Sequence, residues 1–207
     1  LPAMISDWRK LFGQDDLPFY IVSLPAFKHR SPSPVDADEW AETRESQALT
    51  VASVPNTCLA VTVDTGDPNT VHPTDKEPVG NRLAYCALAL KYGQKIPYQG
   101  PSFTSVEPLS GTALRLHFAH AEGGLVVKGD KPEEFEIAGA DHVWHWADAH
   151  VFGDTVIVSS SEVQDPKAAR YAWQSNPAAT LYNQAGLPAV PFRTDDWPLS
   201  TEAARAY

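Results

Sequence analysis

The segment of this chain best suited to catalysis is a loop that holds one histidine and two carboxylates. A strand-like apolar run at residues 61–63 leads into Asp64, Asp67 and Asn69, and the loop then reaches His72. A general base needs one free ring nitrogen and an acid on the other nitrogen, which fixes the tautomer and stabilises the imidazolium. All three polar residues lie within reach of the ring, and spacing does not choose among them. The alternative is a surface histidine beside turn-forming residues.

Two polar residues of a predicted helix are candidate binding residues. The inner stripe of that helix contains Arg44 and Gln47, together with Trp40, Ala48 and Val51. Buried arginine and glutamine side chains need hydrogen-bonding partners. These two residues therefore either support the loop of the site or satisfy each other.

The remaining histidines do not form a metal site in this interpretation. His142, His145 and His150 occupy one predicted strand, and strand alternation places His145 on the opposite face from the other two. Four zinc ligands do not converge from such a pattern, so no metal or other cofactor is expected. Trp144 and Trp146 share a face that could stack on a sugar, but an aromatic core is the favoured interpretation.

The elements that must position the histidine loop alternate between helix and strand up to residue 95. They are a helix over 1–12 that ends at Gly13, a strand centred on 19–22 and buried on both faces, a helix capped by Asp36 or Asp38, a strand over 58–63, and a helix from a cap at Asp75 to Gly93. This order is typical of half of a doubly wound α/β domain, in which ligands bind at the carboxyl ends of the strands. We therefore predict an α/β domain over residues 1–95.

Short alternating runs joined by turns replace the helical pattern from residue 96 to residue 207. Strands are predicted at 113–119, 124–128, 133–137, 143–151, 155–159 and 168–173. They indicate an antiparallel β-sandwich domain. The tail from residue 175, rich in proline and aromatic residues, is expected to pack along a surface without regular elements.

Composition limits the possible partners. The 207 residues carry a net charge of −10, from 16 basic and 26 acidic residues, without a basic cluster, so nucleic acid and anionic membranes are poor partners. No apolar run approaches the roughly 20 residues that span a bilayer. Cys58 and Cys86 are interpreted as two buried thiols rather than a disulfide framework. The start at Leu1 rather than Met indicates a piece of something longer.

The chain resembles the sialate O-acetylesterase family, a carbohydrate-esterase branch of the SGNH hydrolases. The segments that carry the likeness follow the family order over nearly the whole chain: residues 6–9, 17–22, Trp40 with 44–47, 63–73 with Lys76, 80–84, 170–173 with 176–177, and 192–197. The resemblance implies a flavodoxin-like α/β core joined to a β-sandwich, and removal of O-acetyl groups from sugars or glycans. It implies a secreted or periplasmic location.

The resemblance also implies that His72 is the general base of a serine-hydrolase mechanism. In many SGNH enzymes the acid lies three residues before this histidine, where this chain has Asn69, which carries no charge. Asp67 or Asp64 must then replace it, with Asp67 preferred, or the site works as a Ser-His dyad.

The Gly-Gln-Ser-like nucleophile motif of the family is absent. We therefore expect the chain to begin inside the catalytic domain and to be incomplete and inactive alone. Its expected partners are an O-acetylated glycan substrate and the missing N-terminal half of that domain, on the same parent protein or another chain. Two other functions remain open: a non-catalytic carbohydrate-binding or assembly module, and an independent small hydrolase with an unrecognised nucleophile.

Overall fold

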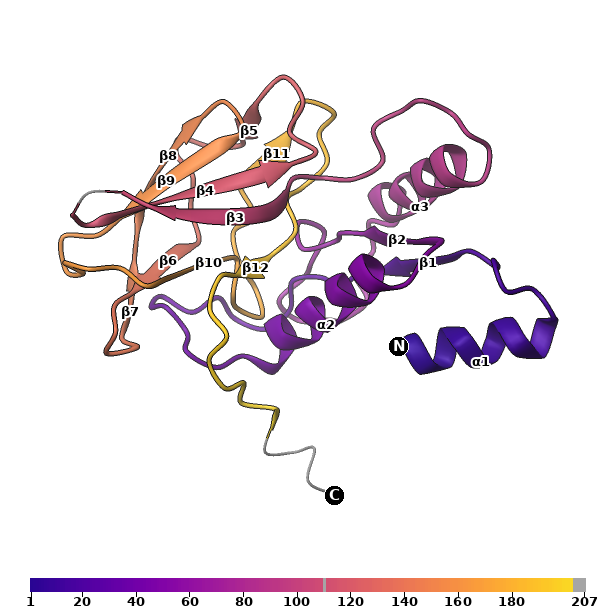
Figure 1. Ribbon diagram of the computed structural model, residues 1–207, viewed down its shortest axis with the longest axis horizontal. Coiled ribbons are helices and arrows are strands. Elements are labelled where there is room, and N and C mark those ends of the chain that lie inside the picture. Colours follow the sequence, from indigo (N-terminus) through magenta and orange to yellow (C-terminus); the bar gives the residue numbers. More distant parts are fainter. Residues whose placement is uncertain (110, 203–207) are drawn as a thin grey trace.

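The computed structural model describes residues 1–109 and 111–202 of a mixed α/β protein with several antiparallel sheets (Figure 1). The first part contains α1 (Pro2–Phe12), β1 (Phe19–Val22), α2 (Glu39–Ser53), β2 (Thr57–Ala60) and α3 (Glu77–Leu90). The antiparallel region follows with β3 (Ser102–Pro108), β4 (Ala113–Ala119), β5 (Leu125–Val127), β6 (Phe135–Ala138), β7 (Trp144–Trp146), β8 (Asp148–Phe152), β9 (Thr155–Ser159), β10 (Ala168–Tyr171), β11 (Leu181–Asn183) and β12 (Phe192–Arg193). Within the described ranges, no helix has both the length and the apolar character needed to cross a bilayer.

Two of the four predicted helix boundaries, Gly13 and Asp38, are confirmed, whereas α3 ends at Leu90, before the predicted Gly93. Helix α1 ends at Gly13, which adopts the left-handed conformation with φ 63°. Helix α2 begins after Asp38, whose carboxylate accepts hydrogen bonds from the second and third helical amides. The predicted cap of α3 at Asp75 is wrong, because Lys76 occupies that position. Asp75 lies one residue before this cap, and its Oδ1 accepts a hydrogen bond from the Glu77 amide at 3.3 Å.

Strands β1 and β2 form a two-stranded parallel sheet that lies between α2 and α3 (Figure 1). Strand β2 is buried throughout, whereas β1 is only half-buried and Val22 is 39% exposed. The prediction that β1 is buried on both faces is therefore wrong. The reason is that, among the described residues, β1 pairs with β2 alone and its other edge has no strand beside it.

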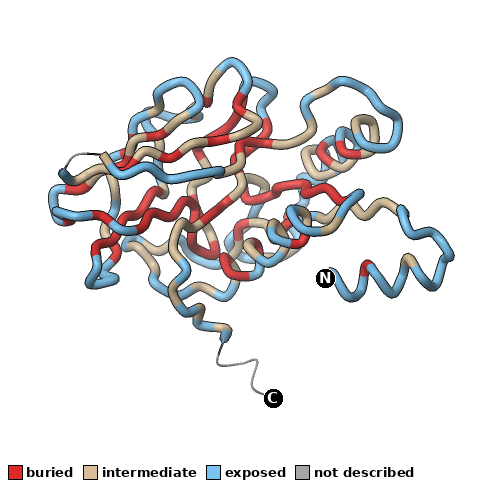
Figure 2. The backbone as a smooth tube through the Cα atoms, in the orientation of Figure 1, coloured by how far each residue is buried: buried red, intermediate tan, exposed pale blue. Residues whose placement is uncertain are grey.

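Two four-stranded antiparallel sheets share one hydrophobic core, visible as the buried strands in Figure 2. Their strand orders are β3-β4-β9-β8 and β12-β10-β6-β7, and a two-stranded sheet, β11-β5, lies beside them. Leu116, Val156 and Val158 from one sheet pack with Ile137 and Ala169 from the other, and all five are fully buried. The apolar residues of the alternating sequence pattern thus face this core.

Two sequence predictions for the antiparallel region are wrong. The segment 143–151, predicted as one strand, forms β7 and β8, because β7 pairs with β6 while β8 pairs with β9 in the other sheet. The tail beyond residue 175, expected to lack regular elements, contains β11 and β12, and Leu181 is fully buried. Apolar side chains of the tail enter the shared core, which a surface segment does not do. Residues 203–207 of that tail lie outside the described residues.

The interpretation of Cys58 and Cys86 as two thiols is also wrong, because they form a disulfide between β2 and α3. Both cysteines are fully buried, and their Cα atoms lie 6.0 Å apart, within the range for disulfides. The packing of α3 on the small sheet brings together two residues that are 28 positions apart in the sequence.

We predict that replacing both Cys58 and Cys86 by alanine lowers the free energy of unfolding by about 3 kcal/mol, because a cross-link over a loop of this length restricts the unfolded chain. Urea denaturation with and without reductant measures the difference. Reduced wild-type protein should approach the stability of the double variant, which should itself not respond to reductant. Equal stability of the oxidised wild type and the variant would contradict the prediction.

Buried Glu136 makes stability depend on pH. Burial raises its pKa to about 8, and the nearby Arg170 lowers it only in part. Arg170 directs its hydrogen bonds to Asp195 and to the Asp36 carbonyl, and Glu136 Oε1 has no hydrogen-bond partner. The folded state therefore keeps a proton that the unfolded chain releases at lower pH.

We predict that the wild type loses stability as the pH rises from about 4.5 to about 8, at up to roughly 1 kcal/mol per pH unit. Glu136→Gln should remove this slope and be the more stable protein at pH 8. Chemical denaturation at several pH values measures it, with the exposed Glu122→Gln as the matched control. A slope that persists in Glu136→Gln would show that another group causes it.

Candidate active site

The loops that follow β1 and β2 meet at the carboxyl end of the small sheet, where open α/β sheets bind ligands. Two hydroxyl side chains keep them paired after the strands end. The Thr62 amide donates to Ser23 Oγ at 2.9 Å, and Thr62 Oγ1 donates to the Ser23 carbonyl at 2.6 Å. Both residues are buried, so the pairing holds the starts of the two loops in one place.

The histidine loop, residues 64–72, rests on Ala26 of the neighbouring loop. A Cβ atom at Gly66 would lie 2.1 Å from the Ala26 carbonyl oxygen, so only glycine fits there. The amide of Asp67 donates to the same oxygen at 3.2 Å. The loop that bears His72 is therefore in direct backbone contact with the loop after β1.

Asp67 and Asn69 lie in a turn that ends at Thr70, and His72 follows two residues later. Asp67 Oδ1 accepts from the Asn69 amide at 2.8 Å, and Thr70 Oγ1 accepts from the His72 amide at 3.1 Å. His72 is exposed. Among the residues that the structure describes, no side chain forms a hydrogen bond or ion pair with its ring, so the acid partner of His72 stays a prediction.

Asp64, the other candidate acid, is held in a buried ion pair. Arg82 of α3 donates to both carboxylate oxygens, at 2.6 and 2.8 Å, and Tyr182 of β11 donates to Oδ2 at 3.1 Å. Burial and the neighbouring Asp64 raise the pKa of Tyr182, so this phenol stays protonated and keeps donating. These contacts tie α3 and β11 to the start of the histidine loop.

Arg44 and Gln47 do not bond to each other. Gln47 Oε1 accepts from the Leu24 amide at 3.0 Å, while its Nε2 donates to the Val22 carbonyl at 3.4 Å. Arg44 is 2% exposed and donates to four carbonyl oxygens, and burial lowers its pKa to about 10. These contacts favour support of the loop after β1 over mutual satisfaction, and a role in binding stays a prediction.

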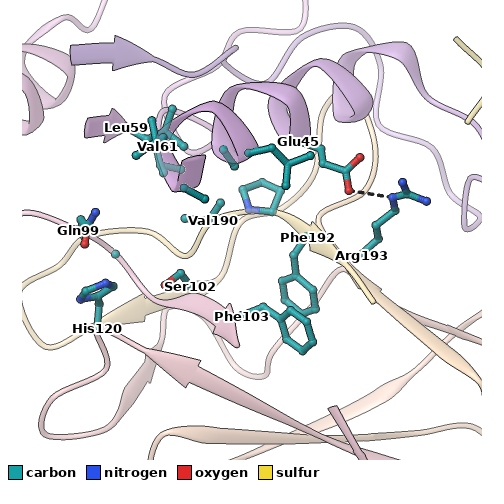
Figure 3. A pocket seen from close by; sticks show the side chains of 16 residues that line it. Glu45, Leu59, Val61, Gln99, Ser102, Phe103, His120, Val190, Phe192 and Arg193 are labelled. Atoms are coloured by element: carbon teal, nitrogen blue, oxygen red, sulfur yellow. Dashed lines mark hydrogen bonds and ion pairs between the residues drawn. The ribbon is translucent and has the colours of Figure 1, made fainter. Parts of the chain in front are cut away.

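A separate cavity of about 410 Å³ lies between α2, β2 and the segment around β12 (Figure 3). Its wall is largely apolar, with a stacked pair, Phe103 and Phe192, on one side and the ion pair of Glu45 with Arg193 on another. None of the six predicted site residues lines it. The cavity is therefore distinct from the histidine loop.

The histidines and tryptophans of the β7 segment have structural contacts. His142 stacks on Trp197, and His145 pairs with Glu162. No group of three potential metal ligands occurs within the described residues. Trp144 is buried and donates to Asp36, whereas Trp146 is 38% exposed and donates to the Pro32 carbonyl. The aromatic-core interpretation therefore fits Trp144 better than Trp146.

No protein-family model matches the chain. Sialate O-acetylesterase from Mus musculus is 29% identical over 213 residues, and that from Homo sapiens is 32% identical over 217 residues, in each case over 92% of this chain. A crystal structure of a carbohydrate acetylesterase from Xanthomonas citri is 42% identical, has a TM-score of 0.88, and covers 95% of this chain and 45% of that one. The resemblance to the sialate O-acetylesterase family is confirmed. The chain matches 39% of the mouse protein and 41% of the human protein, about two fifths of the length of these curated family members.

Sequence reasoning missed Gly66, Arg82 and Tyr182, which hold the histidine loop in this chain. Gly66 and Arg82 both lie in segments that resemble the family, which was the available signal. Tyr182 lies outside those segments, so nothing in the sequence indicated that it approaches Asp64.

We predict that Asp64→Asn lowers the free energy of unfolding by about 3 kcal/mol, because it leaves Arg82 buried without its charged partner. Arg82→Gln should cost a similar amount, and the double variant less than the sum of both. Urea denaturation measures all three. Asp67→Asn keeps an acceptor oxygen and serves as the control, with a change within about 0.5 kcal/mol. A cost at Asp64 no larger than that of the control would contradict a structural role.

Proposed function

We propose that this chain supplies the histidine-bearing part of a carbohydrate O-acetylesterase that uses a serine-hydrolase mechanism with His72 as the general base. The observation that carries the proposal is the exposed His72 on a loop anchored at the carboxyl end of β2, in a chain related to sialate O-acetylesterases over 92% of its length. Ligands of open α/β sheets bind at the carboxyl ends of the strands, so a general base on this loop would lie next to a bound substrate.

In this mechanism a serine hydroxyl attacks the acetyl carbonyl while His72 takes its proton, and His72 then activates water on the acyl-enzyme. Asp67 is the preferred acid partner, because the Asp64 carboxylate is already bonded by Arg82 and Tyr182. Asn69 is left as a candidate binding residue. The serine and the oxyanion donors come from outside this chain, and each donor is worth about 3 kcal/mol.

Within the described residues, the edge of β1 away from β2 has no strand beside it, which supports a partner that completes the sheet. Helix α1, which precedes β1 and contacts it through the Trp8 and Phe19 rings, has five exposed apolar side chains: Leu1, Met4, Trp8, Leu11 and Phe12. In a right-handed crossover, the helix before β1 covers both β1 and the strand on its open side. We therefore propose that residues 1–95 are the C-terminal half of a flavodoxin-like catalytic domain, that its N-terminal half is the partner, and that residues 96–207 are a β-sandwich domain.

The substrate in this proposal is an O-acetylated sugar or glycan, and the location is secreted or periplasmic. The Cys58–Cys86 disulfide supports such a location, because disulfides persist in oxidising compartments. The names of the related proteins support the substrate class, since they are esterases acting on sialate or carbohydrate.

We predict that the isolated chain releases no 4-nitrophenol from 4-nitrophenyl acetate above the buffer rate, because it lacks a nucleophile and oxyanion donors. A polypeptide that joins this chain to the segment bearing the serine should be active. There, His72→Ala should lower kcat by on the order of 10³-fold or more.

The exposed His150→Ala, on β8, is the matched control and should leave activity unchanged. Turnover by the isolated chain that disappears in His72→Ala would sink the claim of an incomplete site. Full activity of His72→Ala in the joined polypeptide would overturn its assignment as the base.

A further inference from the structure

Helix α2 holds the backbone of the segment that follows β1. Arg44 Nε donates to the Leu24 carbonyl at 2.8 Å, and its Nη2 donates to the Pro25 carbonyl at 2.7 Å. Trp40 Nε1 also donates to the Pro25 carbonyl at 2.7 Å. The peptide that leads into Ala26 is thus fixed by two side chains from one face of the helix.

The same guanidinium group reaches a segment about 130 residues further along the chain. Arg44 Nη1 donates to the Gln174 carbonyl at 2.7 Å, and Nη2 donates to the Ser175 carbonyl at 2.8 Å. Asp38, the N-cap of α2, accepts from the Ser175 amide at 2.8 Å and from its hydroxyl. The Phe27 amide donates to the Ser175 carbonyl as well, so the two segments lie side by side around Arg44.

Ala26 lies between Pro25 and Phe27, the two residues held by these contacts, and it packs directly against the histidine loop. Its carbonyl oxygen accepts from the Asp67 amide at 3.2 Å, and Gly66 packs against it too closely for any side chain. A shift of the Pro25–Ala26 peptide therefore moves the turn that presents His72.

We propose that Arg44 is a positioning residue that fixes the position of the His72 loop. It acts through the backbone of Pro25 and Ala26, and its bonds to residues 174–175 of the antiparallel region hold the guanidinium group in place. This deepens the proposed function and rests on it for the catalytic consequence alone. Arg44 is not placed to contact substrate, because it is 2% exposed and four of its five N–H groups donate to backbone carbonyls. A lysine cannot replace it, since one ammonium group does not span carbonyls on two separate segments as a planar guanidinium does.

The first test is amide hydrogen exchange on this chain. Arg44→Lys should raise exchange at Asp67 by on the order of tenfold or more, while the amides of α3 stay protected. Arg9→Lys is the matched control, because Arg9 also donates to two backbone carbonyls, of Leu17 and Pro55, and should leave Asp67 unchanged. Unchanged exchange at Asp67 in a folded Arg44→Lys protein overturns the proposal.

If Arg44→Lys does not fold, Gly66→Ala tests the same route from the other end. It forces the loop away from Ala26, so exchange at Asp67 should rise while the Ser175 amide, held by Asp38, stays protected. Continued protection of Asp67 in that variant shows that the loop does not depend on Ala26 and overturns the proposal.

The second test uses the active joined polypeptide. Arg44→Lys should lower kcat at least about tenfold with KM within about twofold, because it misplaces the base without removing a substrate contact. Arg9→Lys should change neither. A wild-type kcat in Arg44→Lys overturns the proposal. If no joined polypeptide hydrolyses acetyl esters, the proposed function fails, while the exchange result still decides whether Arg44 positions the loop.

Discussion

Buried guanidinium groups must find partners, and this requirement fixes how distant segments of the chain meet. Arg44, Arg82 and Arg170 are almost fully buried, and a charge left there without a partner costs several kcal/mol. Arg82 joins α3 to Asp64 at the start of the histidine loop, and Arg170 joins β10 to Asp195. Arg44 joins the loop after β1 to the antiparallel region. The position of the candidate site thus depends on these polar contacts together with a small apolar cluster of Leu59, Val61 and Val63, while the larger core lies in the antiparallel region.

Backbone groups at the open edge of β1 also find polar partners. The Gln47 amide bonds to the Val22 carbonyl and the Leu24 amide, which are the two groups that a residue of a neighbouring parallel strand would use. A side chain therefore takes the place of a strand at this point. A backbone partner of β1 can pair only up to Val22, and beyond it the chains must diverge. Divergence at the carboxyl end is what opens a crevice in a doubly wound sheet.

Local signals in the sequence were enough for the order of the elements in the first 95 residues, apart from the two ends of α3. Asp38 begins α2 through its side chain and Gly13 ends α1 through its backbone conformation. Both signals depend only on the local sequence. The disulfide, the Asp64–Arg82 pair and the course of the tail were not readable, because each depends on which faces pack together. The half-buried β1 differs for another reason: an apolar run does not reveal that, among the described residues, the strand pairs on one edge only.

An exposed imidazole by itself is a weak catalyst, because general-base assistance of roughly 10² to 10⁴-fold needs the ring held against its reactants. In the proposed mechanism, Asp67 is the residue that holds the ring. Its Oδ1 already accepts from the Asn69 amide, which fixes the carboxylate relative to the backbone that carries His72. The second oxygen, Oδ2, accepts no hydrogen bond within the described residues, so it is the oxygen that the proposed contact with the His72 ring would use. In the proposed mechanism, closure of the site by a partner strengthens this contact by excluding water from the ring.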